Sequence, residues 1–221
     1  MQTEPQPTDI GIPVIHVDDS FVVLNKPSGM LSVPGRGPEK QDCLSSRVQT
    51  LFADALVVHR LDMATSGLLV MARGPLAQRR LNDAFAQRMV HKRYIAWVSG
   101  QLETPGDDWR DIDLPIIVDW PNRPLRVIDH QRGQASVTRV RAVQIDPTGN
   151  RTLVELEPIT GRSHQLRVHL QAIGHPILGD ALYAPGAVAA MASRLQLHAS
   201  NLAFPHPVTS AMVRFDCNAD F

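Results

Sequence analysis

Apolar and polar residues alternate over several short segments of the chain, which is the period of a β-strand with one exposed face. The alternation is clearest over residues 137–145, and residues 152–156 are the expected antiparallel partner across a turn at 146–150. Leu68-Leu69-Val70-Met71 is instead apolar at every position and bounded by Gly67 and Gly74. That run predicts a strand buried on both faces.

The same two periods predict the other elements. Further strands are expected at residues 14–17, 21–24, 93–98, near 195–202 and at 212–216. Helices are expected over residues 43–52, after Pro75, and from Ser163 as N-cap to Gly174 as C-terminal stop. Because strands dominate and helices are not regularly interleaved with them, the sequence predicts an α+β fold with a mixed, mostly antiparallel sheet.

Composition limits the domain organisation. The chain has 221 residues, of which 43% are hydrophobic, enough for one substantial core. We expect a flexible tail over residues 1–13 and one domain over residues 14–221. The amino terminus does not resemble a secretory signal, and no run approaches about 18 consecutive apolar residues. Cys43 and Cys217 are too few for a disulfide framework, which fits a reducing compartment. Together these features predict a cytoplasmic protein without a membrane span.

Charge is balanced over the whole chain but not locally. The 22 basic and 22 acidic side chains give a formal net charge of zero, which does not by itself indicate a nucleic-acid partner. Between Arg79 and Arg93, however, five basic residues stand against one acidic residue, and between Glu103 and Asp119 six acidic residues stand against one basic residue. A molecule polarised in this way can hold a phosphate backbone on one face, although each run can also be a solvated surface.

The stretch of greatest chemical interest is His59-Arg60-Leu61-Asp62, followed by the small-residue turn Met63-Ala64-Thr65-Ser66-Gly67. It places a carboxylate beside a guanidinium on a loop at the entrance of the buried strand, where a reacting side chain is exposed on a fixed base. Two structural alternatives remain open. The Asp62 side chain can close a local turn with the amide of Thr65 or Ser66, or it can pair with Arg60.

Four separated segments, taken together, resemble the motifs of the pseudouridine synthases, specifically the ribosomal large-subunit pseudouridine synthase A family. They are residues 23–29 (VLNKPSG), 59–67 (HRLDMATSG), 92–94 (KRY) and 159–169 (ITGRSHQLRVH). Residues 119–124 (DWPNRP) and 174–180 (GHPILGD) resemble the synthase A branch in particular. The resemblance spans about residues 14–221.

This resemblance implies the pseudouridine synthase fold, a bent sheet in two halves with flanking helices and a central catalytic cleft. It also implies the isomerisation of uridine to pseudouridine, with Asp62 as the catalytic carboxylate. An ionised carboxylate needs a nearby cation, and the resemblance assigns that role to Arg167, whose guanidinium fork matches a carboxylate. It assigns Tyr94 to stacking on the target base and makes it the candidate for removing the C5 proton.

A uridine in a stem-loop must leave its stack before such chemistry, so the resemblance also implies base flipping. It assigns Arg60 to the vacated space. Arg162, His164 and Gln165 are expected at a helix amino terminus, where they can contact phosphate or base edges. His164 and His169 are five residues apart and share a helix face poorly, so we expect no zinc pair, no other metal and no organic cofactor.

The implied partner is structured RNA, with 23S ribosomal RNA and the anticodon arm of transfer RNA as the expected substrates and no obligate protein partner. Since about 13 residues precede the first predicted strand, we expect no separate N-terminal RNA-binding domain. Two alternatives were weighed. One is a non-catalytic RNA-binding protein of the same fold, which the joint presence of Asp62, Tyr94 and Arg167 disfavours. The other is a glycoside or nucleoside hydrolase, which needs a second acid within about 5–9.5 Å, with Asp54 the nearest candidate in sequence.

Overall fold

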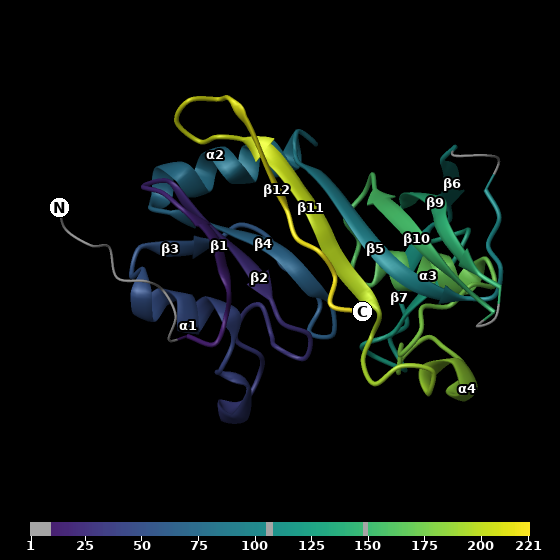
Figure 1. Ribbon diagram of the computed structural model, residues 1–221. Coiled ribbons are helices and arrows are strands. Elements are labelled where there is room, and N and C mark those ends of the chain that lie inside the picture. The colour runs from purple at the N-terminus through teal and green to yellow at the C-terminus, as the bar shows by residue number, and fades with distance from the viewer. Residues whose placement is uncertain (1–9, 105–107, 148–149) are drawn as a thin grey trace. The chain divides into compact units, whose positions relative to one another are not determined.

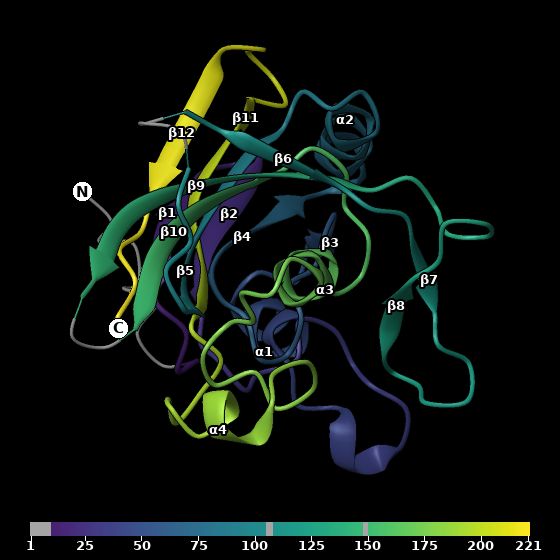
Figure 2. The ribbon, with the colours of Figure 1, turned by 90° about the vertical axis from the view of Figure 1, so that its right-hand side faces the viewer.

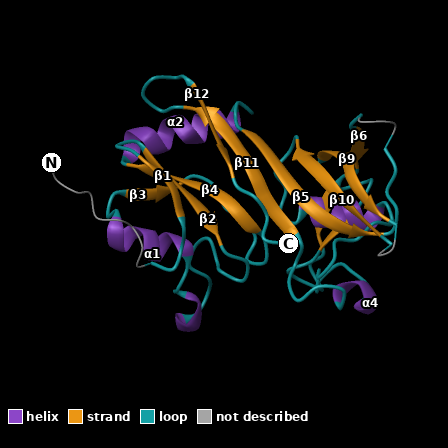
Figure 3. Cartoon of the chain, viewed as in Figure 1, coloured by secondary structure: helices purple, strands orange, loops and turns teal. Residues whose placement is uncertain are grey.

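The computed structural model describes residues 10–104, 108–147 and 150–221. The chain divides into two compact units. Unit 1 contains the chain up to His91 together with Ala199–Asn218, and unit 2 contains Lys92–His198 together with Ala219–Phe221. The mostly antiparallel strands and the few helices confirm the α+β prediction, as the colouring of Figure 3 shows.

Unit 1 is built on strands β1, β2, β3, β4 and β12, most of β11, and two flanking helices (Figure 1). The bounds are β1 Val14–Val17, β2 Phe21–Lys26, η1 Pro38–Lys40, α1 Leu44–Leu51, β3 Ala55–Val57, β4 Ser66–Arg73, α2 Pro75–Ala86, β11 Leu197–Pro205 and β12 Met212–Asp216. Strand β2 pairs antiparallel with β1 and β4, β3 pairs antiparallel with β4, and β12 pairs antiparallel with β11.

Strand β4 is buried along nearly its whole length, as its uninterrupted apolar run predicts. Its side chains pack with those of β2 and β11 and with the apolar side of α2, on which Ala77, Leu81 and Ala84 recur at helical spacing. Phe21, Phe204 and Phe215 meet in this core with ring centroids 5.0–6.0 Å apart. The loop that enters β4 therefore has a rigid base.

Unit 2 contains most of β5, together with β6 to β10, α3 and α4. The bounds are β5 His91–Ser99, β6 Arg110–Asp113, β7 Ile116–Val118, β8 Arg126–Ile128, β9 Val137–Asp146, β10 Arg151–Pro158, α3 Gln165–Ala172 and α4 Gly186–Ala189. Strand β10 pairs antiparallel with β5 and β9, and β9 also pairs antiparallel with β6. Figure 2 shows α3 between the β9–β10 strands and the separate β7–β8 hairpin.

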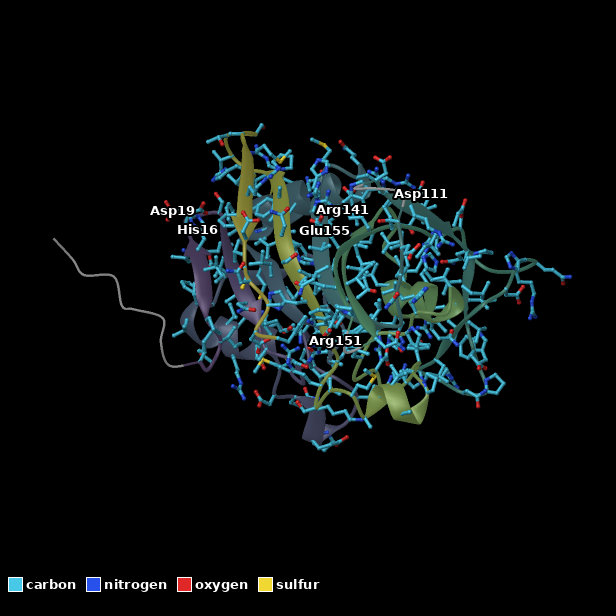
Figure 4. The ribbon with its side chains drawn as sticks, turned by 45° about the vertical axis from the view of Figure 1, so that its right-hand side comes forward. His16, Asp19, Asp111, Arg141, Arg151 and Glu155 are labelled. Carbon is cyan, nitrogen blue, oxygen red and sulfur yellow. The ribbon has the colours of Figure 1, made fainter. Side chains whose placement is uncertain are left out.

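One face of β9 and β10 carries a ladder of ion pairs. Arg141 contacts Glu155 at 2.6 Å, and both side chains are labelled in Figure 4. Arg139 contacts Glu157 at 3.2 Å. Arg93 on β5 also pairs with Glu155, at 3.2 Å. The basic run at residues 79–93 is thus divided between the two units, and its Arg93 is paired within unit 2.

Every strand and helix expected from the sequence is present, with shifts of a few residues at the ends. The short elements η1, β3, β6, β7, β8 and α4 were not predicted. Part of the predicted 146–150 turn, residues 148–149, lies outside the described residues, as do residues 1–9 of the expected tail. The described end of that tail is packed, since Ile10 and Ile12 are buried. Among the described helices, none is long and apolar enough to cross a membrane.

Candidate active site

Asp62 lies on the irregular segment between β3 and β4, and its residue is half-buried. Its backbone carbonyl accepts the N–H of Thr65 at 3.1 Å, which closes a turn over residues 62–65. The main chain therefore closes the turn to Thr65. This leaves the amide of Thr65 occupied without use of the carboxylate.

Lys26, at the end of β2, binds this loop through a backbone carbonyl. Its side chain is fully buried, and its Nζ donates to the carbonyl oxygens of Pro27 at 2.8 Å, Met30 at 2.8 Å and Met63 at 3.1 Å. An ammonium group has three N–H donors, so these three carbonyls match its capacity. Burial lowers the pKa of Lys26 to about 8, while the nearby Asp62 carboxylate acts in the opposite direction. The Lys26 ammonium is still protonated at pH 7.

Two serines fix the main chain on either side of Asp62. The Ser32 hydroxyl donates to the carbonyl of Leu61 at 2.7 Å and accepts the N–H of Leu61 at 3.1 Å. The Ser28 hydroxyl donates to the carbonyl of Ala64 at 2.7 Å. With Met63 bound by Lys26 and by the N–H of Gly29, the carbonyls of residues 61–64 are all engaged. The 26–32 loop is thus a template for the loop that carries Asp62.

The two ends of the loop are tied to strand β4. Nε2 of His59 accepts the N–H of Val70 at 3.0 Å, and its ring stacks on Phe85 with a centroid distance of 4.8 Å. Because Nε2 accepts, the imidazole proton of a neutral His59 lies on Nδ1. At the other end, Gly67 has φ +111°, and a Cβ there would overlap the backbone of Ala199 on β11. Only glycine fits this close approach.

Arg60 is exposed, as a residue that contacts RNA must be. Asp54, the second acid that a hydrolase would need, is also exposed and pairs with Arg73 at 3.3 Å. Its carboxylate is engaged in a surface ion pair, which gives no support to the hydrolase alternative.

Arg167, in unit 2, is the third residue of α3 and is buried together with Asp180. Its Nε donates to Oδ2 of Asp180 at 2.8 Å, and its Nη2 donates to Oδ1 at 2.5 Å. The guanidinium and the carboxylate thus form a bidentate ion pair, the geometry that arginine favours. The sequence predicted Asp62 as the partner of Arg167 and gave no partner within unit 2. The Asp180 pair was not foreseen, and the Asp62–Arg167 contact stays a prediction.

The start of α3 differs from the expectation. The helix begins at Gln165, not after Ser163, and its N-cap is His164 in the left-handed region with φ +59°. His164 Nδ1 lies 2.6 Å from the Tyr183 hydroxyl. Arg162 is exposed, so Arg162 and His164 do gather at the helix amino terminus as predicted.

Gln165 lies at the same helix start. It is buried, its Oε1 accepts from the Thr160 hydroxyl at 2.7 Å and the Arg162 N–H at 3.0 Å, and its Nε2 donates to Val137 and Thr138. All four hydrogen-bonding positions of this amide are therefore used inside the protein. Gln165 organises the segment before α3, and its contact with RNA stays a prediction.

Tyr94 is half-buried on β5, where it is the register partner of Leu156 on β10. Its stacking and proton-transfer roles stay predictions. In the parts of the chain that the structure describes, no three His, Cys, Asp or Glu side chains are grouped as metal ligands would be.

Three functional candidates were missed by sequence reasoning: Lys26, Asp180 and Tyr183. Lys26 and Asp180 lie inside stretches that carried the family resemblance, but no role had been assigned to them. A signal existed for Lys26, because a lysine that ends the apolar run of β2 must bury its charge or leave the sheet. For Asp180 and Tyr183, which are distant in sequence from Arg167, there was no local signal.

Comparison with known proteins defines the class. Residues 20–172 match the family model described as RNA pseudouridylate synthase. The chain belongs to this family, and it is therefore an isomerase that converts uridine in RNA to pseudouridine.

Individual relatives agree over nearly the whole chain. A Yersinia pestis protein named dual-specificity RNA pseudouridine synthase RluA is 50% identical over 208 residues, covering 94% of this chain and 99% of the relative. The Escherichia coli K12 protein of the same name is 44% identical over 221 residues, covering 100% of this chain and 99% of the relative. Among solved structures, human RNA pseudouridylate synthase domain containing 4 matches with a TM-score of 0.73 at 26% identity, covering 93% of this chain and 87% of that chain. Human RNA pseudouridylate synthase domain containing 1 has a TM-score of 0.79 at 24% identity, over 100% of this chain and 87% of its own, and shares the fold.

Proposed function

We propose that this enzyme isomerises specific uridines in stem-loops of both 23S ribosomal RNA and the anticodon arm of transfer RNA, with Asp62 as the catalytic carboxylate. The dual substrate is supported by the dual-specificity relatives at 44–50% identity. The observation that carries the role of Asp62 is its loop. The neighbouring carbonyls are fixed by Ser28, Ser32 and Lys26, and the Lys26 ammonium lies close enough to interact with the carboxylate.

The reaction is an isomerisation, so uridine and pseudouridine have the same molecular formula. The bond from the ribose C1′ to N1 of uracil breaks, the base rotates, a bond from C1′ to C5 forms, and the proton lost from C5 is balanced by one gained at N1. A fixed, ionised carboxylate can serve this exchange as a nucleophile or by stabilising positive charge that develops on the ribose. Both roles need Asp62 in its carboxylate form.

The other roles follow the family resemblance. Arg167 is the counter-ion of Asp62, Tyr94 stacks on the target base and is the candidate to take the C5 proton, and Arg60 occupies the space of the flipped uridine. Arg162 and His164, at the start of α3, contact RNA. Residues 14–221 act as the catalytic domain.

The test is tritium release. The full chain is incubated with 23S RNA or total transfer RNA carrying tritium at C5 of uridine, and the pseudouridine formed is then mapped. We expect release from both RNAs, no release with Asp62→Ala, and normal release with the matched variant Asp54→Ala. Formation of free uracil in place of pseudouridine would support the hydrolase alternative.

Each part of the proposal can fail separately. If only one of the two RNAs releases tritium, the dual-substrate proposal is wrong. If release persists in Asp62→Ala, Asp62 is not the catalytic residue. RNA binding without release from either RNA would support the non-catalytic alternative.

A further inference from the structure

We propose that Asp180 and Tyr183 are positioning residues that orient the Arg167 guanidinium for the isomerisation and join it to His164. This inference rests on the role proposed above for Arg167. All four residues belong to unit 2, and their contacts are described within that unit.

The Asp180 carboxylate fixes the plane of the guanidinium. Its two oxygens take the Nε–Nη2 edge of Arg167, at 2.8 and 2.5 Å, and the two side chains are 1% and 5% exposed. Two parallel hydrogen bonds to one edge leave the planar group no rotation about its own axis. Nη1 is not used by Asp180, and its direction is set by the pair.

Asp180 is itself immobile. Its Oδ1 also accepts the N–H of Leu182 at 2.9 Å and of Tyr183 at 3.1 Å. The preceding Gly179 has φ +73°, and a Cβ there would overlap the Arg194 carbonyl. The turn around Asp180 therefore cannot shift without breaking backbone contacts, and the carboxylate is a rigid support for Arg167.

The Tyr183 ring packs against the face of the Arg167 guanidinium. The carbon at the centre of the Arg167 guanidinium lies 5.0 Å from the centroid of the Tyr183 ring. The Tyr183 hydroxyl accepts the N–H of Arg126, at the start of β8, at 2.9 Å. The same hydroxyl lies 2.6 Å from His164 Nδ1, and the His164 tautomer decides which of the two groups donates. Burial raises the pKa of Tyr183, which keeps the phenol protonated.

One phenol thus connects Arg167, the N-cap of α3 and the β7–β8 hairpin. The connection also supports the left-handed backbone of His164, a conformation that few residues other than glycine adopt. Stability alone is a weak reason for this arrangement, since a buried ion pair is commonly no more stable than apolar residues of similar volume. The pair instead fixes the direction in which the remaining N–H groups of Arg167 point.

The experiment compares Asp180→Asn, Tyr183→Phe and the control Asp146→Asn, which breaks a partly exposed pair with Arg151, at 2.8 Å in unit 2. Tritium release at saturating transfer RNA gives kcat, filter binding gives the RNA Kd, and thermal melting reports folding. We expect kcat to fall about 100-fold in Asp180→Asn and roughly 10-fold in Tyr183→Phe. The Kd should change little in both, and the control should match the wild type.

A double variant distinguishes positioning from general stability. If Asp180 acts through Arg167, adding Asp180→Asn to Arg167→Lys lowers kcat no further than Arg167→Lys alone. Independent, multiplying losses would overturn the proposal. So would a wild-type kcat in folded Asp180→Asn, or in Tyr183→Phe if Asp180→Asn does not fold. Failure of the proposed function has a different signature, because Asp62→Ala would then keep its tritium release.

Discussion

Asp62 in unit 1 and Arg167 in unit 2 are held in opposite ways. The loop of Asp62 is fixed through its main chain, whose carbonyls are bound by Lys26, Ser28 and Ser32. Arg167 is fixed through its own side chain, by the Asp180 carboxylate and the Tyr183 ring. The first arrangement determines where the backbone of the reacting residue runs, and the second determines where the functional group itself points.

The difference has consequences for tolerance to mutation. A loop held through its carbonyls accepts changes in its own side chains but not in the residues that bind it. A side chain held by a charged partner fails when either partner is lost, and is repaired in part when both are replaced. The expected outcomes below test this contrast, from the largest effect to the smallest.

Gly67→Ala should be the most damaging change in unit 1. The new Cβ would overlap the backbone of Ala199, in a strand core that cannot move aside. We expect a loss of more than about 4 kcal/mol in the free energy of unfolding, or failure to fold. Urea denaturation measures it, with Gly186→Ala as control, because a Cβ at Gly186 meets nothing within 4 Å. A folded Gly67→Ala variant of normal stability would show that the backbone of Ala199 can move to make room for the new Cβ.

Arg167→Met should leave Asp180 buried without its cation. We expect about 3–5 kcal/mol of lost stability. Adding Asp180→Asn, which removes the unpaired charge and keeps an oxygen for the Leu182 and Tyr183 amides, should restore part of it. Denaturation of both variants measures the recovery. If the double variant is less stable than Arg167→Met, the pair is not held as a charge pair.

Lys26→Met should destabilise unit 1 without such a repair, because the carbonyls of Pro27 and Met30 lose the Lys26 donor while Met63 keeps the N–H of Gly29. Each buried carbonyl without a partner costs about 1–3 kcal/mol, offset in part by removal of the buried charge. We expect a net loss of about 2–3 kcal/mol and a lower kcat. Melting and tritium release measure these effects, and Lys40→Met, at an exposed site, is the control. Unchanged turnover would mean that the loop keeps its shape without Lys26.

The pH dependence of Lys26 sharpens the same point. Its pKa is about 8 in the folded protein, below the ordinary value of 10.5, so the native state releases its proton first as pH rises. Between pH 8 and 10.5 the unfolded state binds more protons, and the stability of the wild type relative to Lys26→Met should therefore increase with pH. Turnover should instead fall above about pH 8, because a neutral amine donates to only two of the three carbonyls. Denaturation and kcat at pH 7 and 9.5 test both signs.

Ser32→Ala should have the smallest effect. It removes one buried hydroxyl that binds both the N–H and the carbonyl of Leu61, at a cost of about 1–2 kcal/mol. Since Lys26 and Ser28 still hold the loop, we expect kcat to fall only severalfold. A loss as large as that of Lys26→Met would place the main support of the loop at Ser32.

Periodicity was sufficient for the long elements. The apolar run of β4 and the alternation of β9 each reflect the burial of whole faces, which local sequence encodes. The short strands β3, β6, β7 and β8 were missed because three or four residues carry too little period to be recognised. The N-cap of α3 was predicted one residue too early, at Ser163. The observed N-cap is His164, whose backbone is left-handed.

For the site, the sequence indicated which segments matter but not how each residue works. Asp62 and Arg60 lie on the expected loop, and Arg162 and His164 gather at a helix start as predicted. Gln165 was expected at a helix amino terminus, where it also lies, but its hydrogen bonds with Thr160, Val137 and Thr138 could not be read from the sequence. The pairing of Arg167 with Asp180 depends on tertiary packing across 13 residues of chain, which no periodic pattern encodes.

The bond from Val70 to His59 has a consequence for protein engineering. Strand β3 ends at Val57, and beyond it an imidazole takes the place of a peptide group on that edge of β4. The segment from His59 to Ser66 is therefore a cassette, fastened to the sheet at its two ends and to the 26–32 loop between them. Its exposed positions, Arg60 and Met63, can be varied while the sheet keeps its register.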